Sequence, residues 1–437
     1  MHNIHEHIEH ITRVEGHGNL VINIQDGKIK ELRLDIVEAP RFFEAMLVGR
    51  SYEEAVHITS RICGICAVTH TTASLKAIES AFGIVPDEQT IKLRKLMFNG
   101  EIIQSHILHL YILAAPDFLG VKSVFPLIKT NEDIVKRAFR LKGLANDLCM
   151  IIGGRHIHPC SMVVNGFTNL PKKKDLNLIL ERFKNTRQDI EETVSLFKSV
   201  RLPDFNRKTE YLCLDTEPQY TFYDGDIRSS FDWTIDTKLY RDVIKEFVVN
   251  NSTAKFARAS TDSYMVGALA RINNGFDKLN KRAQEIASEL GFTPPSFNPF
   301  MNNIAQLIEV VQCVDDTIEL IEDVLGEELK ARIPIDKDVR IKGGLGVGAV
   351  EAPRGTLYHE YEIDEKGIIT GANCIIPTAQ NLNNIQLDLH ALVPMIIDKS
   401  KEEIIRTIEM LIRAYDPCIS CATHILRVEF EGERCRV

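Results

Sequence analysis

The chain has 437 residues, 44% of them hydrophobic and 26% charged, which is typical of a globular protein and excludes a disordered, collagen-like or membrane-embedded chain. With about 100–200 residues per domain, this length allows two to four units that share an ample core. The net charge of −9, together with a longest basic run of only residues 172–174, argues against nucleic acid as a partner.

The N-terminal segment has neither the cationic start nor the apolar run of a secretory signal. The most apolar stretch, residues 107–116, is about half as long as the roughly 20 residues that a membrane span needs. We therefore expect a cytoplasmic protein without a membrane span. Four histidines, His2, His5, His7 and His10, could form a metal-binding arm, but a frayed polar terminus is the favoured interpretation.

Apolar and polar residues alternate over 19–37 around Asp26 and Gly27, which predicts a β-hairpin with a tight turn. From about residue 40 to 330, apolar residues recur at spacings of three and four, which predicts a central helical bundle. The helices expected there span 91–115, 132–152, 175–200, 239–249, 276–290 and 303–328.

The glycine-rich stretch 342–348 resembles a phosphate-binding loop, but it lacks the Lys-Ser/Thr ending and no clear helix follows, so we expect no nucleotide there. Residues 358–363 and 367–376 predict a second hairpin, and 401–414 a last helix. The fold class expected is α+β, mainly α with small β-hairpin lobes, in one integrated multi-lobed unit over 1–437. Its lobes are an N-terminal hairpin lobe (1–60), the helical bundle (61–330), a β-rich segment (331–395) and a C-terminal helical segment (396–424).

Ten cysteines are too few in a chain of this length for a disulfide scaffold, so their spacing matters more than their number. Two pairs, Cys63-x-x-Cys66 and Cys418-x-x-Cys421, each place two sulfurs on one side of a turn. A structural zinc site has its pairs about 15–20 residues apart, and a thioredoxin-like redox motif occurs once, so a four-thiolate metal site built from both ends of the chain is favoured. The other six are expected to be small buried hydrophobes: Cys149, Cys160, Cys213, Cys313, Cys374 and Cys435.

The sequences around these pairs, RICGICAVTH (61–70) and DPCISCATH (416–424), resemble the two cysteine signatures of nickel-iron hydrogenase large subunits. Five further motifs occur in the order of that family, so the resemblance covers essentially the whole chain. They are RVEGHG (13–18), RFFEAMLVGR (41–50), GGRHIHP (153–159), EAPRG (351–355) and IIPTAQN (375–381). The resemblance implies the large-subunit fold and the reversible heterolytic cleavage of dihydrogen.

It also implies that Cys63 and Cys418 are terminal nickel ligands, whereas Cys66 and Cys421 bridge nickel to an iron that carries cyanide and carbon monoxide. Thiolates are soft, charged donors and suit nickel chemically. The proton from dihydrogen would pass to the thiolate of Cys418 and on to Glu15, the carboxylate that matches the family's proton gate.

Around the metals, the resemblance places Arg354 and its neighbour Pro353 over the centre, with the arginine against one cyanide. Thr378 would bind the other cyanide, and His70 would donate a hydrogen bond to the sulfur of Cys421. Asp416 would accept from Arg354 or cap the terminal turn.

A magnesium or other divalent cation is implied at a second site, formed by Glu44, His424 and the backbone carbonyl of Cys374. Carboxylate and carbonyl oxygens suit such a hard cation, which tolerates one imidazole.

The chain departs from membrane-linked relatives at Ser105, where they carry an aspartate, and this weakens the carboxylate support of Arg354. It thereby resembles the cytoplasmic, bidirectional branch of NAD(P)-linked enzymes and archaeal sulfhydrogenases. Family precursors carry a C-terminal tail that a maturation endopeptidase removes after nickel loading, so residues 425–437 are expected to be a propeptide that is cleaved after His424.

Because the chain has neither a further cysteine motif for iron-sulfur clusters nor a dinucleotide motif, its electrons must leave through partners. We expect an iron-sulfur small subunit, towards which His156 and His158 face, and flavin- or NAD(P)-binding subunits beyond it. The alternatives are a dihydrogen sensor with the same ligands, a non-catalytic relative of the quinone-site protein of complex I, and a structural zinc protein. Retention of all four cysteines argues against the complex I relative.

Overall fold

The computed structural model begins with a small N-terminal sheet. It describes residues 3–330, 341–424, 427–430 and 433–436, and for the last two ranges it describes the backbone alone. Strands β2 (Gly18–Gln25) and β3 (Lys28–Ile36) pair across Asp26 and Gly27, whose φ angles of 51° and 73° suit a tight hairpin turn. The predicted first hairpin is therefore confirmed.

A third strand, β1 (Ile4–Ile8), pairs with β2, so the prediction of a frayed N-terminus was wrong. Ile4 packs into the core, and this burial anchors the strand. His5 and His7 lie on its exposed face and His10 follows it, whereas His2 lies outside the described residues.

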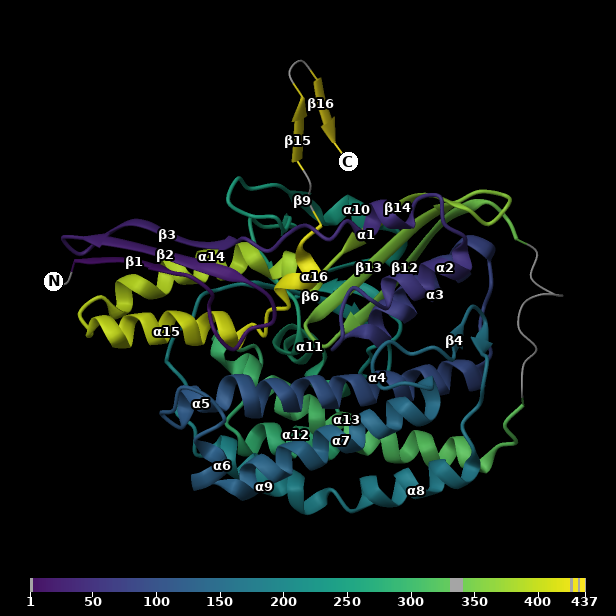
Figure 1. Ribbon diagram of the computed structural model, residues 1–437. Helices are drawn as coiled ribbons and strands as arrows, with labels where there is room; N and C mark the ends of the chain where they lie inside the picture. The colour runs from purple at the N-terminus through teal and green to yellow at the C-terminus, as the bar shows by residue number, and fades with distance from the viewer. Residues whose placement is uncertain (1–2, 331–340, 425–426, 431–432, 437) are drawn as a thin grey trace.

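Several long helices form the layer at the bottom of Figure 1. Helix α4 (Glu88–Leu108) packs against both α7 (Glu132–Gly153) and α13 (Asn302–Gly326), as the predicted bundle requires. A π-helical segment, η1 (His109–Ala114), continues α4 without a break. The structure is mainly helical with small sheets, which confirms the predicted α+β class.

Three predicted helices differ from the structure. Residues 175–200 form two helices, α8 (Lys173–Lys184) and α9 (Arg187–Lys198), because the side chains of Asn185 and Thr186 donate to helix carbonyls and end α8. Residues 276–290 also form two elements, the 3-10 helix η3 (Phe276–Lys278) and helix α12 (Lys281–Glu289). The side chain of Asn280 caps the start of α12.

The prediction of a helix over residues 239–249 was wrong. A short helix, α10 (Tyr240–Val243), is followed by strand β9 (Lys245–Phe247), which pairs with β10 (Phe256–Arg258). The aromatic and β-branched residues of this stretch favour a strand when a partner strand is available.

The C-terminal sheet contains β12 (Gly344–Ala352), β13 (Gly355–Ile363) and β14 (Ile369–Ile375), which confirms the second hairpin and adds a strand to it. The glycine-rich stretch is part of β12 and packs on helix α3 (Ala67–Phe82). A Cβ at Gly346 would lie 2.0 Å from the carbonyl oxygen of Ala77. These glycines therefore permit close packing of helix on sheet.

Two helices that begin at the motifs were not predicted, α3 and α14 (Pro377–Ile396). Both are buried on most sides, so neither shows the one-sided apolar pattern that identifies a surface helix. The final helix, α15 (Lys401–Ala414), is confirmed and starts at a capping box formed by Ser400 and Glu403.

The remaining elements are short. They are α1 (Phe43–Leu47), α2 (Tyr52–Thr59), α5 (Ala115–Phe118), α6 (Leu127–Thr130), β4 (Met162–Val163), β5 (Gly166–Phe167), β6 (Glu210–Asp215), β7 (Asp226–Ser229), β8 (Trp233–Ile235), η2 (Thr237–Leu239), β11 (Tyr264–Met265), α11 (Ala268–Gly275), η3 (Phe276–Lys278), α12 (Lys281–Glu289), η4 (Pro299–Met301), α16 (Ile419–Ala422), β15 (Arg427–Phe430) and β16 (Glu433–Arg436). None of the helices in the described ranges is both long and apolar enough to cross a bilayer.

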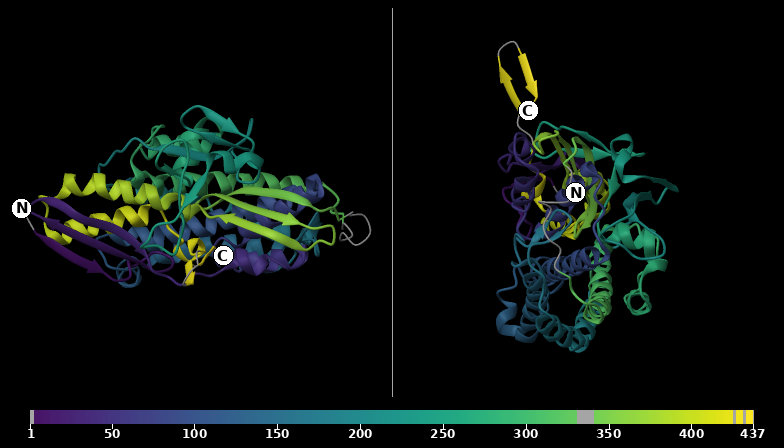
Figure 2. Two further views of the ribbon diagram at one scale, coloured as in Figure 1. Left: turned by 90° about the horizontal axis from the view of Figure 1, so that it is seen from above. Right: turned by 90° about the vertical axis from the view of Figure 1, so that its right-hand side faces the viewer.

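The N-terminal sheet lies along the C-terminal helices α14 and α15 (Figures 1 and 2), so segments from the first and last parts of the sequence are neighbours. Asp117 joins them: its carboxylate lies 2.5 Å from the guanidinium of Arg13 and accepts two bonds from Arg413, at 2.7 and 3.0 Å. Asp117 and Arg413 are buried and Arg13 is nearly so. We call this trio the Asp117 clamp.

We predict that Asp117→Asn lowers the free energy of unfolding by about 3–5 kcal/mol, because it removes the carboxylate that Arg13 contacts and leaves Arg413 with the more distant carboxylate of Glu409, at 3.3 Å. Chemical denaturation of the purified protein measures the loss. The matched control is Glu191→Gln, which breaks the exposed pair with Arg187 and should cost at most about 1 kcal/mol. Equal losses in the two variants would contradict the prediction.

Candidate metal centre

Both cysteine pairs lie where a loop enters a helix. Cys66 directly precedes α3, and Cys418 directly precedes α16, which contains Cys421. In the first loop the peptide N–H groups of Ile65 and Cys66 point at the sulfur of Cys63, each at 3.2 Å. Local chain geometry thus directs the sulfurs to one side of each loop.

The fold brings the two pairs together although they lie at opposite ends of the sequence. The sulfur of Cys63 is 3.7 Å from that of Cys418, and the sulfur of Cys66 is 3.9 Å from that of Cys421. All four sulfurs lie within 4.8 Å of one another and are buried, and those of Cys418 and Cys421 are in disulfide contact. As reduced thiolates they form a soft donor set of the kind that binds nickel or iron.

The pKa values of the first pair are shifted in opposite directions. A hydrogen bond from Cys66 lowers the pKa of the Cys63 thiol, and the positive charge of Arg354 adds to this effect. The same bond and burial raise the pKa of Cys66 well above its usual value. A metal ion that binds both sulfurs requires both thiols to be deprotonated.

Arg354 lies in the turn between β12 and β13 and is held by Asp416. Its Nε donates to the Asp416 carbonyl at 2.6 Å and one terminal nitrogen donates to the carboxylate at 2.9 Å. Ser105 accepts only a long bond of 3.4 Å, so Asp416 supplies the carboxylate that Ser105 does not. Burial opposes the charge of Arg354, but Asp416 raises its pKa and keeps it cationic.

A small cavity lies between these groups and the cysteines. Thr378, in the first turn of α14, forms part of its wall and accepts the peptide N–H of Cys418 at 2.9 Å. Pro353 lies outside the wall, and its carbonyl accepts from Arg271 at 3.2 Å. The residues around the cavity are Cys66, His70, Ala352, Arg354, Ile376, Pro377, Thr378, Cys418 and Cys421.

His70 contributes to this wall, but its Nδ1 lies 3.2 Å from Nε2 of His359, a residue that no sequence motif singled out. Burial lowers the pKa of His70 well below its usual value and that of His359 to about 3, so both rings are neutral at pH 7. The predicted bond from His70 to the sulfur of Cys421 stays a prediction.

Glu15 lies directly beside the cysteines. Its Oε2 is 3.1 Å from the sulfur of Cys418 and accepts the N–H of Ser420, also at 3.1 Å. Gly16 follows with φ of 86°, and a Cβ there would lie 2.7 Å from the peptide nitrogen of Ser420. The Glu-Gly pair of the RVEGHG motif is therefore required for this close approach.

The residues predicted for a second cation are also close to one another, but in a different arrangement. Glu44 accepts the N–H of Cys374 at 2.8 Å, whereas the prediction used the carbonyl of that residue. Lys255, which no sequence pattern indicated, lies 3.5 Å from Glu44. His424 contacts the Cys421 carbonyl through Nε2, and its buried Nδ1 has no partner. A carboxylate and an unpaired imidazole nitrogen fit a cation ligand set.

The GGRHIHP loop lies next to the first cysteine loop, where a Cβ at Gly64 would contact Ile157. His158 bonds to the carbonyl of Ser60 at 2.7 Å, whereas His156 and Ile157 are exposed. The loop thus lies over the metal-binding turn and faces solvent.

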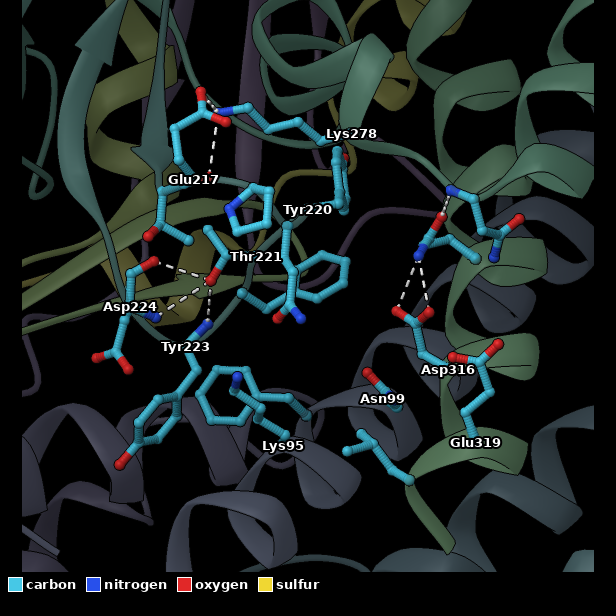
Figure 3. A pocket seen from close by; sticks show the side chains of 18 of the residues that line it. Lys95, Asn99, Glu217, Tyr220, Thr221, Tyr223, Asp224, Lys278, Asp316 and Glu319 are labelled. Atoms are coloured by element: carbon cyan, nitrogen blue, oxygen red, sulfur yellow. Dashed lines mark hydrogen bonds and ion pairs between the residues drawn. The ribbon is translucent and has the colours of Figure 1, made fainter. Parts of the chain in front are cut away.

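A larger cavity of about 780 Å³ lies away from the cysteines, between α4, α13 and the loop 216–224 (Figure 3). Tyr220 lines it and donates to Glu309 at 2.5 Å. Although burial opposes ionisation, Arg271 holds the pKa of Glu309 at about 2. Glu309 therefore stays anionic and cannot accept a proton from the centre at neutral pH.

Four buried cysteine sulfurs, placed where a helical bundle meets two small sheets, define a metalloenzyme that binds its metals through thiolates. The chain belongs to the nickel-dependent hydrogenase family, whose model matches residues 41–136 and 214–424. It is the catalytic large subunit of a nickel-iron hydrogenase, an oxidoreductase that acts on dihydrogen, and the resemblance noted in the sequence is confirmed.

Similar proteins cover nearly the full length. The alpha subunit of sulfhydrogenase 1 of Pyrococcus furiosus is 36% identical over 96% of this chain and 98% of its own length. The alpha subunit of sulfhydrogenase 2 of the same organism is 34% identical over 96% of this chain and 99% of its own. The structure of an NAD+-reducing [NiFe]-hydrogenase in the H2-reduced state matches with a TM-score of 0.86 and 30% identity over 96% of this chain and 99% of that one.

We predict that Cys421→Ser purifies with little nickel and iron, because a serine hydroxyl is a harder and much less acidic ligand than a thiol. Metal analysis by inductively coupled plasma mass spectrometry tests this. The control is Cys160→Ser, which should keep its metals because Cys160 is not part of the cluster. Cys160 is exposed, so the prediction that it is buried was wrong. Full nickel occupancy in Cys421→Ser would rule out this ligand.

Proposed function

We propose that this protein catalyses the reversible heterolytic cleavage of dihydrogen, with Cys63 and Cys418 as terminal nickel ligands and Cys66 and Cys421 as bridges to iron. All four sulfurs lie within 4.8 Å of one another, which supports one shared centre, and the division into terminal and bridging ligands follows the family resemblance. When bound, the nickel-iron centre with its cyanide and carbon monoxide ligands supplies the site at which dihydrogen is polarised.

The observation that carries the proposal is the 3.1 Å contact between the sulfur of Cys418 and Glu15. A thiolate that takes up the proton of dihydrogen needs an acceptor within hydrogen-bond distance. Glu15 is half-buried and fixed by Ser420, so it can receive this proton and pass it outwards.

The other groups around the cavity bind or orient ligands of the iron. Arg354 is cationic and supplies N–H donors towards an anionic cyanide, and its neighbour Pro353 is held through its carbonyl. Thr378 and the N-terminal turn of α14 present a hydroxyl and the positive end of a helix dipole. His70, as a neutral ring, can donate to the sulfur of Cys421 and tune its basicity.

We also propose that Glu44 and His424, with Cys374, hold a magnesium ion next to the second cysteine pair. The unpaired Nδ1 of His424 and the carboxylate of Glu44 support this assignment. The cation would fix the end of α16 and thereby the position of Cys421.

Electrons must leave towards partner subunits. The exposed His156 and Ile157 of the GGRHIHP loop support an iron-sulfur small subunit docked over the first cysteine turn, whereas His158 fixes the loop through its bond to Ser60. Similarity to an NAD+-reducing hydrogenase supports an NAD(P)-binding partner beyond it. A flavin subunit and a cytoplasmic location are proposed from the family resemblance of the sequence.

Residues 425–437 are proposed to be a propeptide. The match to the family ends at His424, whose side chain is buried, and the hairpin formed by β15 and β16 stands away from the body in Figure 1. A maturation endopeptidase would remove this tail after nickel is loaded.

We predict that Cys418→Ser abolishes dihydrogen oxidation and that Glu15→Gln lowers it about 10²–10⁴-fold, because an amide cannot take up the proton. Glu15→Gln should keep its nickel and the infrared bands of cyanide and carbon monoxide. Glu38→Gln is the matched control, since Glu38 also bonds to Ser420 but does not contact the sulfur. Unchanged turnover in Glu15→Gln would refute the proton route.

Mass spectrometry tests whether residues 425–437 are removed. We predict that the chain in the active holoenzyme ends at His424, whereas protein produced without nickel keeps Val437. An intact Val437 in active enzyme would disprove the propeptide.

A further inference from the structure

His109 begins the π-helical segment η1 and lies in the core with 1% of its surface exposed. Neither the cysteine cluster nor the proton route through Glu15 uses this histidine. Single π-turns within longer helices are frequent at functional sites, and this one follows α4 directly.

Both ring nitrogens of His109 face hydrogen-bond acceptors. Nε2 lies 2.8 Å from the carbonyl oxygen of Arg413, in the last turn of α15. Nδ1 lies 2.5 Å from Oε1 of Gln306. A peptide carbonyl oxygen can only accept, so Nε2 carries a hydrogen.

The orientation of Gln306 settles the second nitrogen. The amide nitrogen of Gln306 donates to one carboxylate oxygen of Asp416 at 3.1 Å, and the other oxygen accepts from Arg354 at 2.9 Å. A flipped amide would place its oxygen against this carboxylate, so the amide oxygen must face His109. Nδ1 therefore also donates, and a histidine that donates through both nitrogens is cationic.

The surroundings are compatible with this charge. The C-terminal end of α15, which contributes the Arg413 carbonyl, is the negative end of a helix dipole. The guanidinium of Arg413 is turned towards Asp117 and Glu409. From α13, Glu309 lies one turn beyond Gln306 and is paired with Arg271 and His106.

We infer that His109 is a buried imidazolium that positions Asp416 through Gln306 and, through Asp416, positions Arg354. The inference rests on the proposed function for the role of Arg354. Asp416 has a φ of 50°, a left-handed conformation that costs energy in a non-glycine residue, and the donors on both sides of its carboxylate hold it there. Because a cationic His109 donates through Nδ1, the amide oxygen of Gln306 faces it and the amide nitrogen faces Asp416. His109 is thus a positioning residue that acts on Asp416 through Gln306.

The charge is tested by solid-state ¹⁵N spectroscopy at pH 7 on the holoenzyme complex, with only this chain labelled at histidine. The signals that disappear in His109→Gln belong to His109, and both should show directly bonded hydrogen. If His109→Gln does not assemble, Gln306→Leu identifies the same signals by shifting them. One protonated and one bare nitrogen would overturn the inference whether or not the hydrogenase proposal holds.

The positioning role is tested by His109→Gln, Gln306→Leu and the double variant. Each single variant should keep its nickel, shift the infrared cyanide bands and lower kcat about 10–100-fold, as expected when a reacting group is displaced by a fraction of an ångström. The double variant should be no worse than either single one, because both act through one chain of bonds. The control His390→Gln changes an exposed histidine on α14 and should have no effect.

Effects of His109→Gln and Gln306→Leu that add independently would overturn the role, as would a lower melting temperature with unshifted cyanide bands. Failure of the proposed function itself would appear differently, as absence of cyanide bands in the unmodified protein.

Discussion

The metal centre depends on the contact between two segments from opposite parts of the sequence, one at Glu15 and one at Cys418. Glu15 and Cys418 pair as adjacent backbone segments, and the N–H of Ile419 donates to the carbonyl of Glu15 at 2.9 Å. The Asp117 clamp holds this contact from behind, since Arg13 lies two residues before Glu15 and Arg413 five residues before Cys418. Loss of any one member of the clamp removes a partner of a buried charge, which is strongly destabilising. The position of the metal centre therefore depends on the packing that holds the clamp together.

Charge balance is the second constraint on this site. Four cysteine sulfurs in the core would be costly as thiolates without compensation. The described residues supply it through Arg354, through peptide N–H groups that point at Cys63, and through helices α3, α14 and α16, which all begin beside the cluster. Bound metals would complete the balance, and a cationic His109 would place one more positive charge behind Asp416.

Much of the fold follows from local pattern. The hairpin turn at Asp26 and Gly27, the helices α4, α7, α13 and α15, and the second hairpin could be predicted, because their periodicity and turn residues agree with their tertiary environment. The strand over 245–247 could not, since its backbone hydrogen bonds depend on a partner at 256–258. Helices α3 and α14 escaped prediction because burial on most sides removes the amphipathic signal.

The sequence by itself determined the donor chemistry: two Cys-x-x-Cys turns, Glu15 before a glycine, and an arginine in EAPRG. These residues are identifiable because their type and spacing already limit what they can bind. Only the tertiary structure showed which of the two predicted roles Asp416 takes, by placing it against Arg354. It also decided that Lys255 lies beside Glu44, that His359 pairs with His70, and that Gln306 links His109 to the site. Such partners come from distant segments, and no local pattern records which buried polar groups will meet.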